Sequence, residues 1–307
     1  MQNPLDAAVK AIVYGILEGL TEWLPVSSTG HMIILNAIPG FDLQTVYGRD
    51  FWEFFLVVIQ FGAILAVIWK FFKKLNPLSD NNTKEHNRKV WLTWLKILIG
   101  CLPAGIAGVL LELLLPDGVT DSLNSVPVVA SMLLLYGAAF VLIERLNKKK
   151  ARDFQLSLAR EGLDPNTPYP YKYQTVGSFG YLTVFYIGLI QMLSIIPGTS
   201  RSGVTILGAL LLCSSRGAAA EFRFYLSIPI MLGATLVKGI SFYRSGTILS
   251  NNMIVYLFFG VLTAFLVSLV VIGKLMQFVK KHSFEGFGYY RLGLGALLVI
   301  LFAIGLI

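Results

Sequence analysis

The sequence predicts an all-α polytopic membrane protein, with six transmembrane helices and two re-entrant helical hairpins arranged as an inverted repeat. Hydrophobic residues make up 55% of the 307 residues and charged residues only 14%, against about 25% charged in a typical soluble domain. Six apolar segments are long enough to cross a bilayer, which takes about 20 residues. Two further apolar regions are interrupted by proline, glycine and hydroxyl residues, which is typical of backbone that turns inside the membrane.

The predicted elements form a single integral membrane domain, 1–307, with two similar halves. The first half, 1–146, holds a re-entrant hairpin at 7–38 and spans at 51–72, 90–115 and 126–146. A cytoplasmic linker follows at 147–177. The second half, 178–307, holds a hairpin at 178–213 and spans at 217–242, 252–279 and 288–307.

Similar residues recur at the breaks of the two hairpins. Residues 25–30 (PVSSTG) resemble residues 197–203 (PGTSRSG), with one residue inserted. Because three spans follow each hairpin, the two halves have opposite orientations, which is the inverted-repeat plan of many transporter folds. The first hairpin would then enter from outside and the second from the cytoplasm, and their tips could meet within the membrane.

Charge patterning predicts the orientation of the chain. The formal net charge is +8, with 25 Lys and Arg against 17 Asp and Glu. The loops after the first, third and fifth spans hold many of the bases, whereas loops 116–125 and 243–251 hold only Arg244. By the positive-inside rule the base-rich loops are cytoplasmic and both termini lie outside. The positive charge therefore indicates membrane lipid as a partner and no nucleic acid.

Two glutamates lie in the first apolar region, within residues 18–31 (EGLTEWLPVSSTGH). Glu18 and Glu22 are spaced i, i+4 and share one face of a helix. Like charges at this spacing repel each other unless they share a proton or a cation. A divalent cation, Mg²⁺ or Ca²⁺, would bind both carboxylates and bridge them to a phosphate ligand. The alternative is a pair of helix-end carboxylates that face water.

The same motif continues, after the proline that breaks the helix, with hydroxyls and an imidazole: Ser27, Ser28, Thr29 and His31. A helix that resumes at Ser27 or Ser28 would point its first amide groups at an anion in the turn. His31 would then lie within reach of either serine, and its imidazole could activate a hydroxyl as a nucleophile. Alternatively, His31 could protonate a leaving oxygen.

The second apolar region carries an arginine among small residues, at 197–205 (PGTSRSGVT). Arg201 presents a planar fork of donors suited to phosphate oxygens. Gly198 and Gly203 leave backbone amides open to an anion. The hydroxyls that complete this candidate binding set are Ser200, Ser202 and Thr205.

Several charged residues lie near the ends of the predicted spans, among them Glu144, Arg223 and Arg291. Long charged side chains at such positions usually reach the interface with their polar ends. We therefore expect them to snorkel, without a special role.

The two motifs resemble the signatures of the bacterial undecaprenyl-diphosphate phosphatases, the bacitracin-resistance membrane phosphatases. The resemblance implies hydrolysis of undecaprenyl diphosphate to undecaprenyl phosphate and phosphate, which recycles the lipid carrier of cell-wall synthesis and confers bacitracin resistance. It also implies a divalent cation, and a multi-pass protein of the bacterial plasma (inner) membrane whose active site opens to the outer face.

Carried over by position, the resemblance implies the following roles. Glu18 and Glu22 match the acidic pair, Ser28 the proposed nucleophile, His31 the essential histidine and Arg201 the phosphate-binding arginine. The matching hydroxyls are Ser27, Thr29, Ser200, Ser202 and Thr205. One departure is Leu56, which stands where the family has an acidic residue. Glu53, one turn earlier, is the candidate substitute.

Some alternatives remain open at this point. The nucleophile could be Ser28, His31 or a water molecule with a glutamate as base. The inverted repeat is also compatible with a transporter or flippase for a lipid phosphate, which would move its substrate without releasing phosphate. The sequence leaves the oligomeric state open, a homo-oligomer included.

Overall fold

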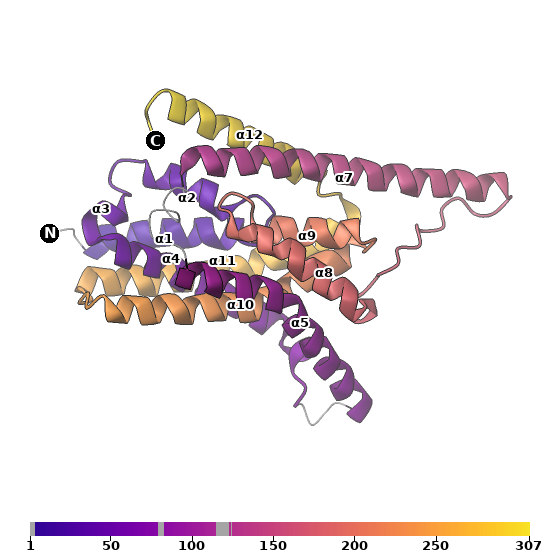
Figure 1. The fold of residues 1–307 in the computed structure, drawn as a ribbon, viewed down its shortest axis with the longest axis horizontal. Helices are drawn as coiled ribbons and strands as arrows, with labels where there is room; N and C mark the ends of the chain where they lie inside the picture. Colours follow the sequence, from indigo (N-terminus) through magenta and orange to yellow (C-terminus); the bar gives the residue numbers. More distant parts are fainter. Residues whose placement is uncertain (1–3, 79–82, 115–122, 124) are drawn as a thin grey trace.

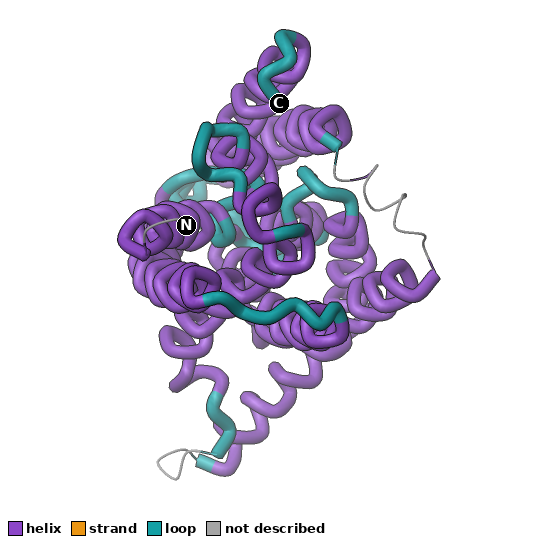
Figure 2. The backbone as a smooth tube through the Cα atoms, turned by 90° about the vertical axis from the view of Figure 1, so that its left-hand side faces the viewer, coloured by secondary structure: helices purple, strands orange, loops and turns teal. Residues whose placement is uncertain are grey.

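The computed structural model describes residues 4–78, 83–114, 123 and 125–307. These residues fold into helices, and no β-strand occurs among them (Figures 1 and 2). The helices of the first half are α1 (Pro4–Thr21), α2 (Ser28–Asn36), α3 (Leu43–Tyr47), α4 (Arg49–Leu75), α5 (Lys84–Leu114) and α7 (Val126–Arg160). Those of the second half are η1 (Val176–Ser178), α8 (Tyr181–Gln191), η2 (Met192–Ile195), α9 (Arg201–Leu211), α10 (Arg216–Arg244), α11 (Asn251–Lys281) and α12 (Glu285–Ala303).

Six helices are long and apolar enough to cross a membrane: α4, α5, α7, α10, α11 and α12. Each covers most of one predicted span, so the prediction of a six-span, all-α membrane protein is confirmed. The last span was predicted to reach residue 307, but α12 ends at Ala303. The end predicted for the second span, residue 115, lies outside the described residues.

Helix α7 runs beyond its predicted span. It continues to Arg160, through fourteen residues that the sequence assigned to a linker, and projects past the rest of the bundle (Figure 1). At 35 residues it is about 50 Å long, against about 30 Å for the hydrocarbon core of a bilayer. The basic residues that follow the apolar segment therefore extend a continuous helix, and only the later part of 147–177 connects it to α8.

Each region predicted as a hairpin is a helix, a break and a second helix. In the first, α1 ends at Thr21 and α2 begins at Ser28; in the second, α8 and η2 are followed by a break before α9. Helix α1 enters from the end of the bundle that carries the N-terminus, and α8 enters from the opposite end (Figure 1). Whether these hairpins re-enter the membrane, and whether the halves are an inverted repeat, remain predictions.

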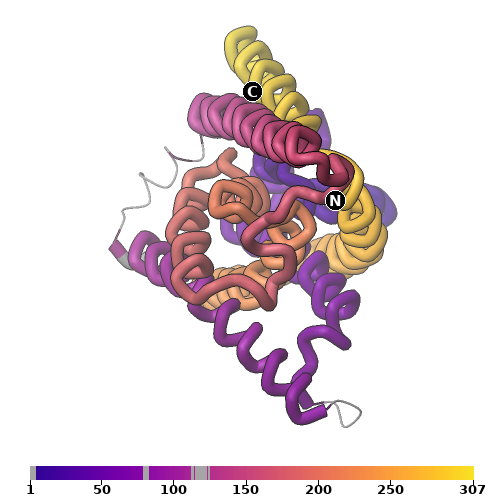
Figure 3. Tube along the Cα trace, turned by 90° about the vertical axis from the view of Figure 1, so that its right-hand side faces the viewer, coloured from indigo at the N-terminus to yellow at the C-terminus, as the bar shows by residue number. Residues whose placement is uncertain are grey.

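The helices that surround the two hairpins pack as close pairs. Helix α1 lies along α11, and α7 lies along α12 (Figures 1 and 3). The α1–α11 contact is tight because Gly15 lies against the backbone of Gly260, where an added Cβ would come within 2.7 Å of its carbonyl oxygen. Large apolar side chains remain exposed on the outer faces of the spans, as lipid contact requires.

The two chain termini lie toward one end of the bundle (Figure 1). The far end of α7 lies toward the other end. That the base-rich segments are cytoplasmic stays a prediction of the charge pattern.

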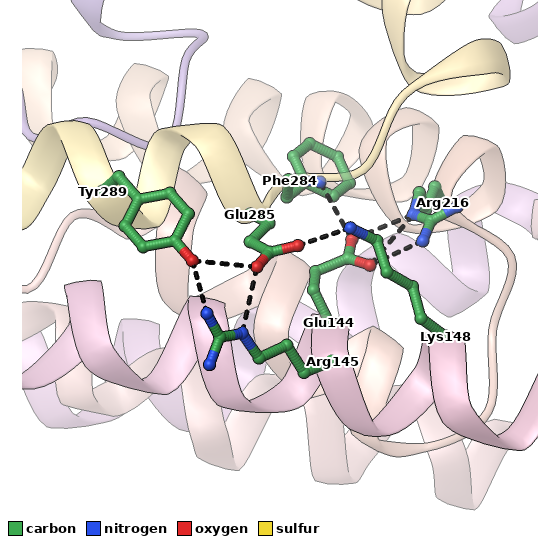
Figure 4. A network of polar contacts seen from close by, with 7 residues as sticks. All are labelled: Glu144, Arg145, Lys148, Arg216, Phe284, Glu285 and Tyr289. Atoms are coloured by element: carbon green, nitrogen blue, oxygen red, sulfur yellow. Dashed lines mark hydrogen bonds and ion pairs between the residues drawn. The ribbon is translucent and has the colours of Figure 1, made fainter.

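A buried ion pair connects α7 to α10, and surface ion pairs connect α7 to α12 (Figure 4). Glu144 of α7 is fully buried, and it accepts hydrogen bonds from the Arg216 guanidinium and from the Phe284 amide. The expectation that Glu144 snorkels is therefore wrong, because neighbouring elements cover it. Glu285, the first residue of α12, pairs with Arg145 and Lys148 of α7 at the surface.

Candidate active site

The breaks of the two hairpins have the same unusual backbone geometry. Ser27 has φ 72° and ψ 101°, and Ser200 has φ 67° and ψ 113°, each directly before the first residue of a helix. In the described chain only Cys213 shares a positive φ among non-glycine residues. Positive φ in a serine costs about 1–3 kcal/mol and is characteristic of functional sites. The residues that follow directly, Ser28 and Arg201, are two of the predicted catalytic residues.

The two turns touch each other. The Ser202 hydroxyl of the second turn donates to the Leu24 carbonyl of the first at 3.1 Å. Gly198 brings the second turn against α7: its φ is +88°, and an added Cβ would come within 2.5 Å of the Val129 carbonyl oxygen. The position therefore requires glycine for both its conformation and its packing.

Arg291 of α12 bonds to the backbone of both turns. Its Nη1 donates to the Pro25 carbonyl at 3.3 Å, and its Nη2 donates to the carbonyls of Gly198 and Thr199 at 2.9 and 3.1 Å. The side chain is fully buried. The expectation that Arg291 snorkels is therefore wrong: one guanidinium satisfies carbonyl groups that both broken helices leave without a partner.

A small pocket of about 80 Å³ opens between the turns, and its lining comes from both of them. The predicted residues that line it are Glu22, Ser27, Ser28, Thr29, Gly198, Ser200 and Arg201. Most of the lining side chains are hydroxyls or charged groups, so the pocket suits a polar head group rather than an acyl chain.

Beside the pocket, a buried glutamate pairs with a buried arginine. Glu22 accepts a hydrogen bond from Arg223 Nη2 at 2.8 Å, and the Arg223 guanidinium lies 4.7 Å from the Trp23 ring. Arg223 is 2% exposed, so the expectation that it snorkels is also wrong. Glu18 is 1% exposed, lies close enough for its charge to interact with Glu22, and has a buried Oε1 without a hydrogen-bond partner.

Further polar atoms at the site are buried without a hydrogen-bond partner, among them Arg201 Nη1, Ser27 Oγ and Thr199 Oγ1. Buried polar groups are nearly always paired, because leaving one unpaired costs about 1–3 kcal/mol. Arg201 also lines the pocket. A donor in this position is suited to an anionic ligand.

His31 lies behind the first turn, and it is not among the residues that line the pocket. Its Nδ1 is 2.7 Å from the Ser27 carbonyl oxygen, and its Nε2 is 2.7 Å from the Tyr290 hydroxyl. The imidazole therefore bonds to a serine carbonyl and a tyrosine, where the sequence suggested a serine hydroxyl.

Three predicted binding residues are not among those that line the pocket. Ser202 bonds to the first turn, Thr205 donates to the Arg201 carbonyl inside α9, and Gly203 gives its amide to Ser200 Oγ. They shape the second turn rather than line the cavity.

The pocket lining includes residues that the sequence analysis did not assign to the site: Thr21, Gln60 and Ser194. Gln60 is the one with a visible signal, because it is the only amide side chain within the apolar part of α4. Glu53 does not supply a further acid there, since it pairs with Arg49 and Lys238.

Comparison with known proteins identifies the family of this chain. The family described as "Bacitracin resistance protein BacA" matches residues 11–297. An undecaprenyl-diphosphatase of Streptococcus mutans is 43% identical over 291 residues, which are 95% of this chain and 94% of the relative. The corresponding protein of Streptococcus thermophilus is 42% identical over 299 residues, 97% of this chain and 94% of the relative. That of Enterococcus faecalis is 40% identical over 290 residues, 94% and 95% of the two chains. The chain therefore belongs to the bacitracin resistance protein BacA family.

Proposed function

We propose that this membrane protein hydrolyses undecaprenyl diphosphate to undecaprenyl phosphate and inorganic phosphate. The observation that carries the proposal is one pocket in which hydroxyls, a carboxylate and a guanidinium from two distant motifs converge. The names of the relatives in Streptococcus and Enterococcus support the choice of substrate. The reaction would recycle the lipid carrier of cell-wall synthesis and confer bacitracin resistance.

The diphosphate binds between the turns. Arg201 donates to its oxygens from the second turn. From the first, the N-terminus of α2 faces it, where Ser27 makes no side-chain cap to the helix amides. Both groups stabilise the charge on the phosphoryl group that is transferred, which is the largest catalytic contribution in this chemistry.

Ser28 is the nucleophile that the geometry favours, because it lines the pocket and His31 does not. Its Oγ attacks the terminal phosphorus, the bond from that phosphorus to the bridging oxygen breaks, and undecaprenyl phosphate leaves. Water then cleaves the phosphoserine and releases phosphate. Glu22 lines the pocket with Ser28 and is placed to accept the serine proton. His31, three residues after Ser28, is the alternative acceptor.

Glu18 and Glu22 fit a divalent cation, Mg²⁺ or Ca²⁺. Their carboxylates are buried side by side, and Glu18 Oε1 has no hydrogen-bond partner. Such ions accept one or two carboxylates together with substrate phosphate oxygens. When bound, the ion supplies positive charge that offsets the negative charge of the diphosphate. Among the described residues no cluster of three or more His, Cys, Asp or Glu side chains offers a fuller protein site.

The polyprenyl chain of the substrate lies in the bilayer, against the apolar outer faces of the spans. The protein resides in the bacterial plasma (inner) membrane, with the pocket open to the outer face. Membrane lipid therefore surrounds the protein and also supplies its substrate.

Phosphate release by the purified protein tests the proposal. We expect turnover of the C55 diphosphate that stops when a chelator removes divalent cations. We also expect slower turnover of a C15 diphosphate. Retention of near wild-type rates in Arg201→Ala and His31→Ala would contradict the site assignment. Movement of the lipid across vesicles without phosphate release would instead indicate a flippase.

A further inference from the structure

We infer that Tyr290 of α12 is a positioning residue for His31, an assignment that rests on the proposed function. Tyr290 lies 259 residues from His31 in the chain, yet its hydroxyl is 2.7 Å from His31 Nε2. The two rings are nearly parallel, with 7° between their planes and 5.7 Å between their centroids.

The contacts of His31 define which ring nitrogen carries the proton. The Ser27 carbonyl can only accept a hydrogen bond, so Nδ1 must be the donor. In the neutral imidazole Nε2 is then the acceptor, and the Tyr290 hydroxyl donates to it. Nε2 is therefore the nitrogen that gains and loses a proton.

The same contact suits both charge states of the ring. When Nε2 is protonated it becomes a donor, and the Tyr290 oxygen can accept from it. The ring is thus held by the Ser27 carbonyl on one side and by Tyr290 on the other, before and after a proton moves. Tyr290 acts on the reaction through His31, without contact with the pocket.

Contacts before and after Tyr290 fix its helix. Glu285 pairs with Arg145 and Lys148 in the α7–α12 contact (Figure 4). Arg291 is bonded to both turns. Tyr290 therefore projects from a helix that is anchored on either side of it, and a rigid support of this kind keeps a reacting group in place.

The test compares Tyr290→Phe with Tyr289→Phe. Each variant loses one hydroxyl from a half-exposed ring, since Tyr289 is 49% and Tyr290 51% exposed. We expect Tyr290→Phe to lower kcat for phosphate release roughly tenfold, with KM unchanged, because one hydrogen bond is lost. Tyr289→Phe should keep the wild-type kcat. In a His31→Ala background, Tyr290→Phe should have no further effect, since neighbours that act together are not additive.

A spectroscopic signature separates positioning from general stability. The chain has three histidines, so His86→Gln with His282→Gln leaves His31 alone for ¹⁵N labelling. We expect Nε2 to be unprotonated in the neutral ring. Its ¹⁵N resonance should move downfield in Tyr290→Phe and stay in place in Tyr289→Phe.

Three results would overturn the inference: equal kcat in the two phenylalanine variants, full additivity of Tyr290→Phe with His31→Ala, or a proton on Nε2 of the neutral ring. The proposed function fails separately, if His31→Ala and Arg201→Ala both hydrolyse the diphosphate at wild-type rates.

Discussion

Three buried or partly buried arginines around the turns differ in what they bond. Arg223 pairs with a carboxylate and Arg291 with backbone carbonyls, and each of the three keeps at least one buried nitrogen without a hydrogen-bond partner. Only Arg201 lines the pocket, so it is the arginine placed to bind a ligand. The other two hold the parts of the site together.

At the residue scale, we expect Arg291→Met to loosen both turns. It leaves the Pro25, Gly198 and Thr199 carbonyls without their donor, and unpaired buried groups cost about 1–3 kcal/mol each. Thermal unfolding in detergent should show a loss of at least about 2 kcal/mol, with phosphate release reduced in the protein that stays folded. Arg291→Lys should recover part of both losses.

The control for this substitution is Arg244→Met, at the exposed end of α10. It removes the same side chain from a surface position and should leave unfolding and turnover unchanged. Equal stability of Arg291→Met and Arg244→Met would contradict the role given to Arg291.

The sequence predicted the residues with chemistry better than it predicted those that support them. Arg201, Ser28 and Glu22 lie in motifs whose composition is unusual for an apolar region, and they line one pocket. Arg223 and Arg291 were expected to snorkel because they lie near span ends. Hydropathy predicts where a residue lies along a span, but it does not predict which other helices pack around that residue. Their burial arises from contacts across about 200 residues of chain or more, which no local pattern reports.

At the scale of elements, the fold depends on how α12 is fixed against α7. Glu144 is fully buried with Arg216, whereas Glu285 pairs with side chains that are 52–64% exposed. Breaking a buried pair leaves an uncompensated charge, and solvent screens the exposed one.

We expect Glu144→Gln to destabilise the protein by about 3 kcal/mol and Glu285→Gln to have a much smaller effect. Thermal unfolding of the two variants, side by side in one detergent, measures the difference. Similar melting temperatures for Glu144→Gln and Glu285→Gln would show that the buried pair does not anchor α12.

Helices were predictable from apolar length, and their true ends were less so. The basic run after the third span is rich in lysine, arginine and alanine, which are good helix formers, so α7 continues to Arg160. The breaks at the two turns were visible from proline and glycine. The matching positive φ at Ser27 and Ser200 was not, because serine rarely adopts it.

At the scale of the whole molecule, the termini lie toward one end of the bundle and the far end of α7 toward the other (Figure 1). If the positive-inside rule holds, the loop between α10 and α11 faces outside, and the far end of α7 is cytoplasmic.

Labelling of single cysteines in intact cells checks this orientation. In a background without Cys101 and Cys213, we expect a membrane-impermeant maleimide to label Ile248→Cys, which stands at an 89% exposed position, and to leave Lys149→Cys unlabelled. Both positions should react after the cells are opened. The reverse pattern would invert the orientation and place the pocket toward the cytoplasm.

The account as a whole depends on two turns, from opposite ends of the bundle, acting as one phosphoryl-transfer site. The direct measurement is phosphate release from undecaprenyl diphosphate by Ser28→Ala in the first turn, Arg201→Ala in the second and the double variant. We expect each single change to lower kcat by at least about 100-fold, and the double variant to be no slower than the slower single, because residues of one site act as a unit. A wild-type rate in either single variant would contradict the claim that the two turns form one site. A loss of kcat in the double variant equal to the product of the two single losses would contradict it too.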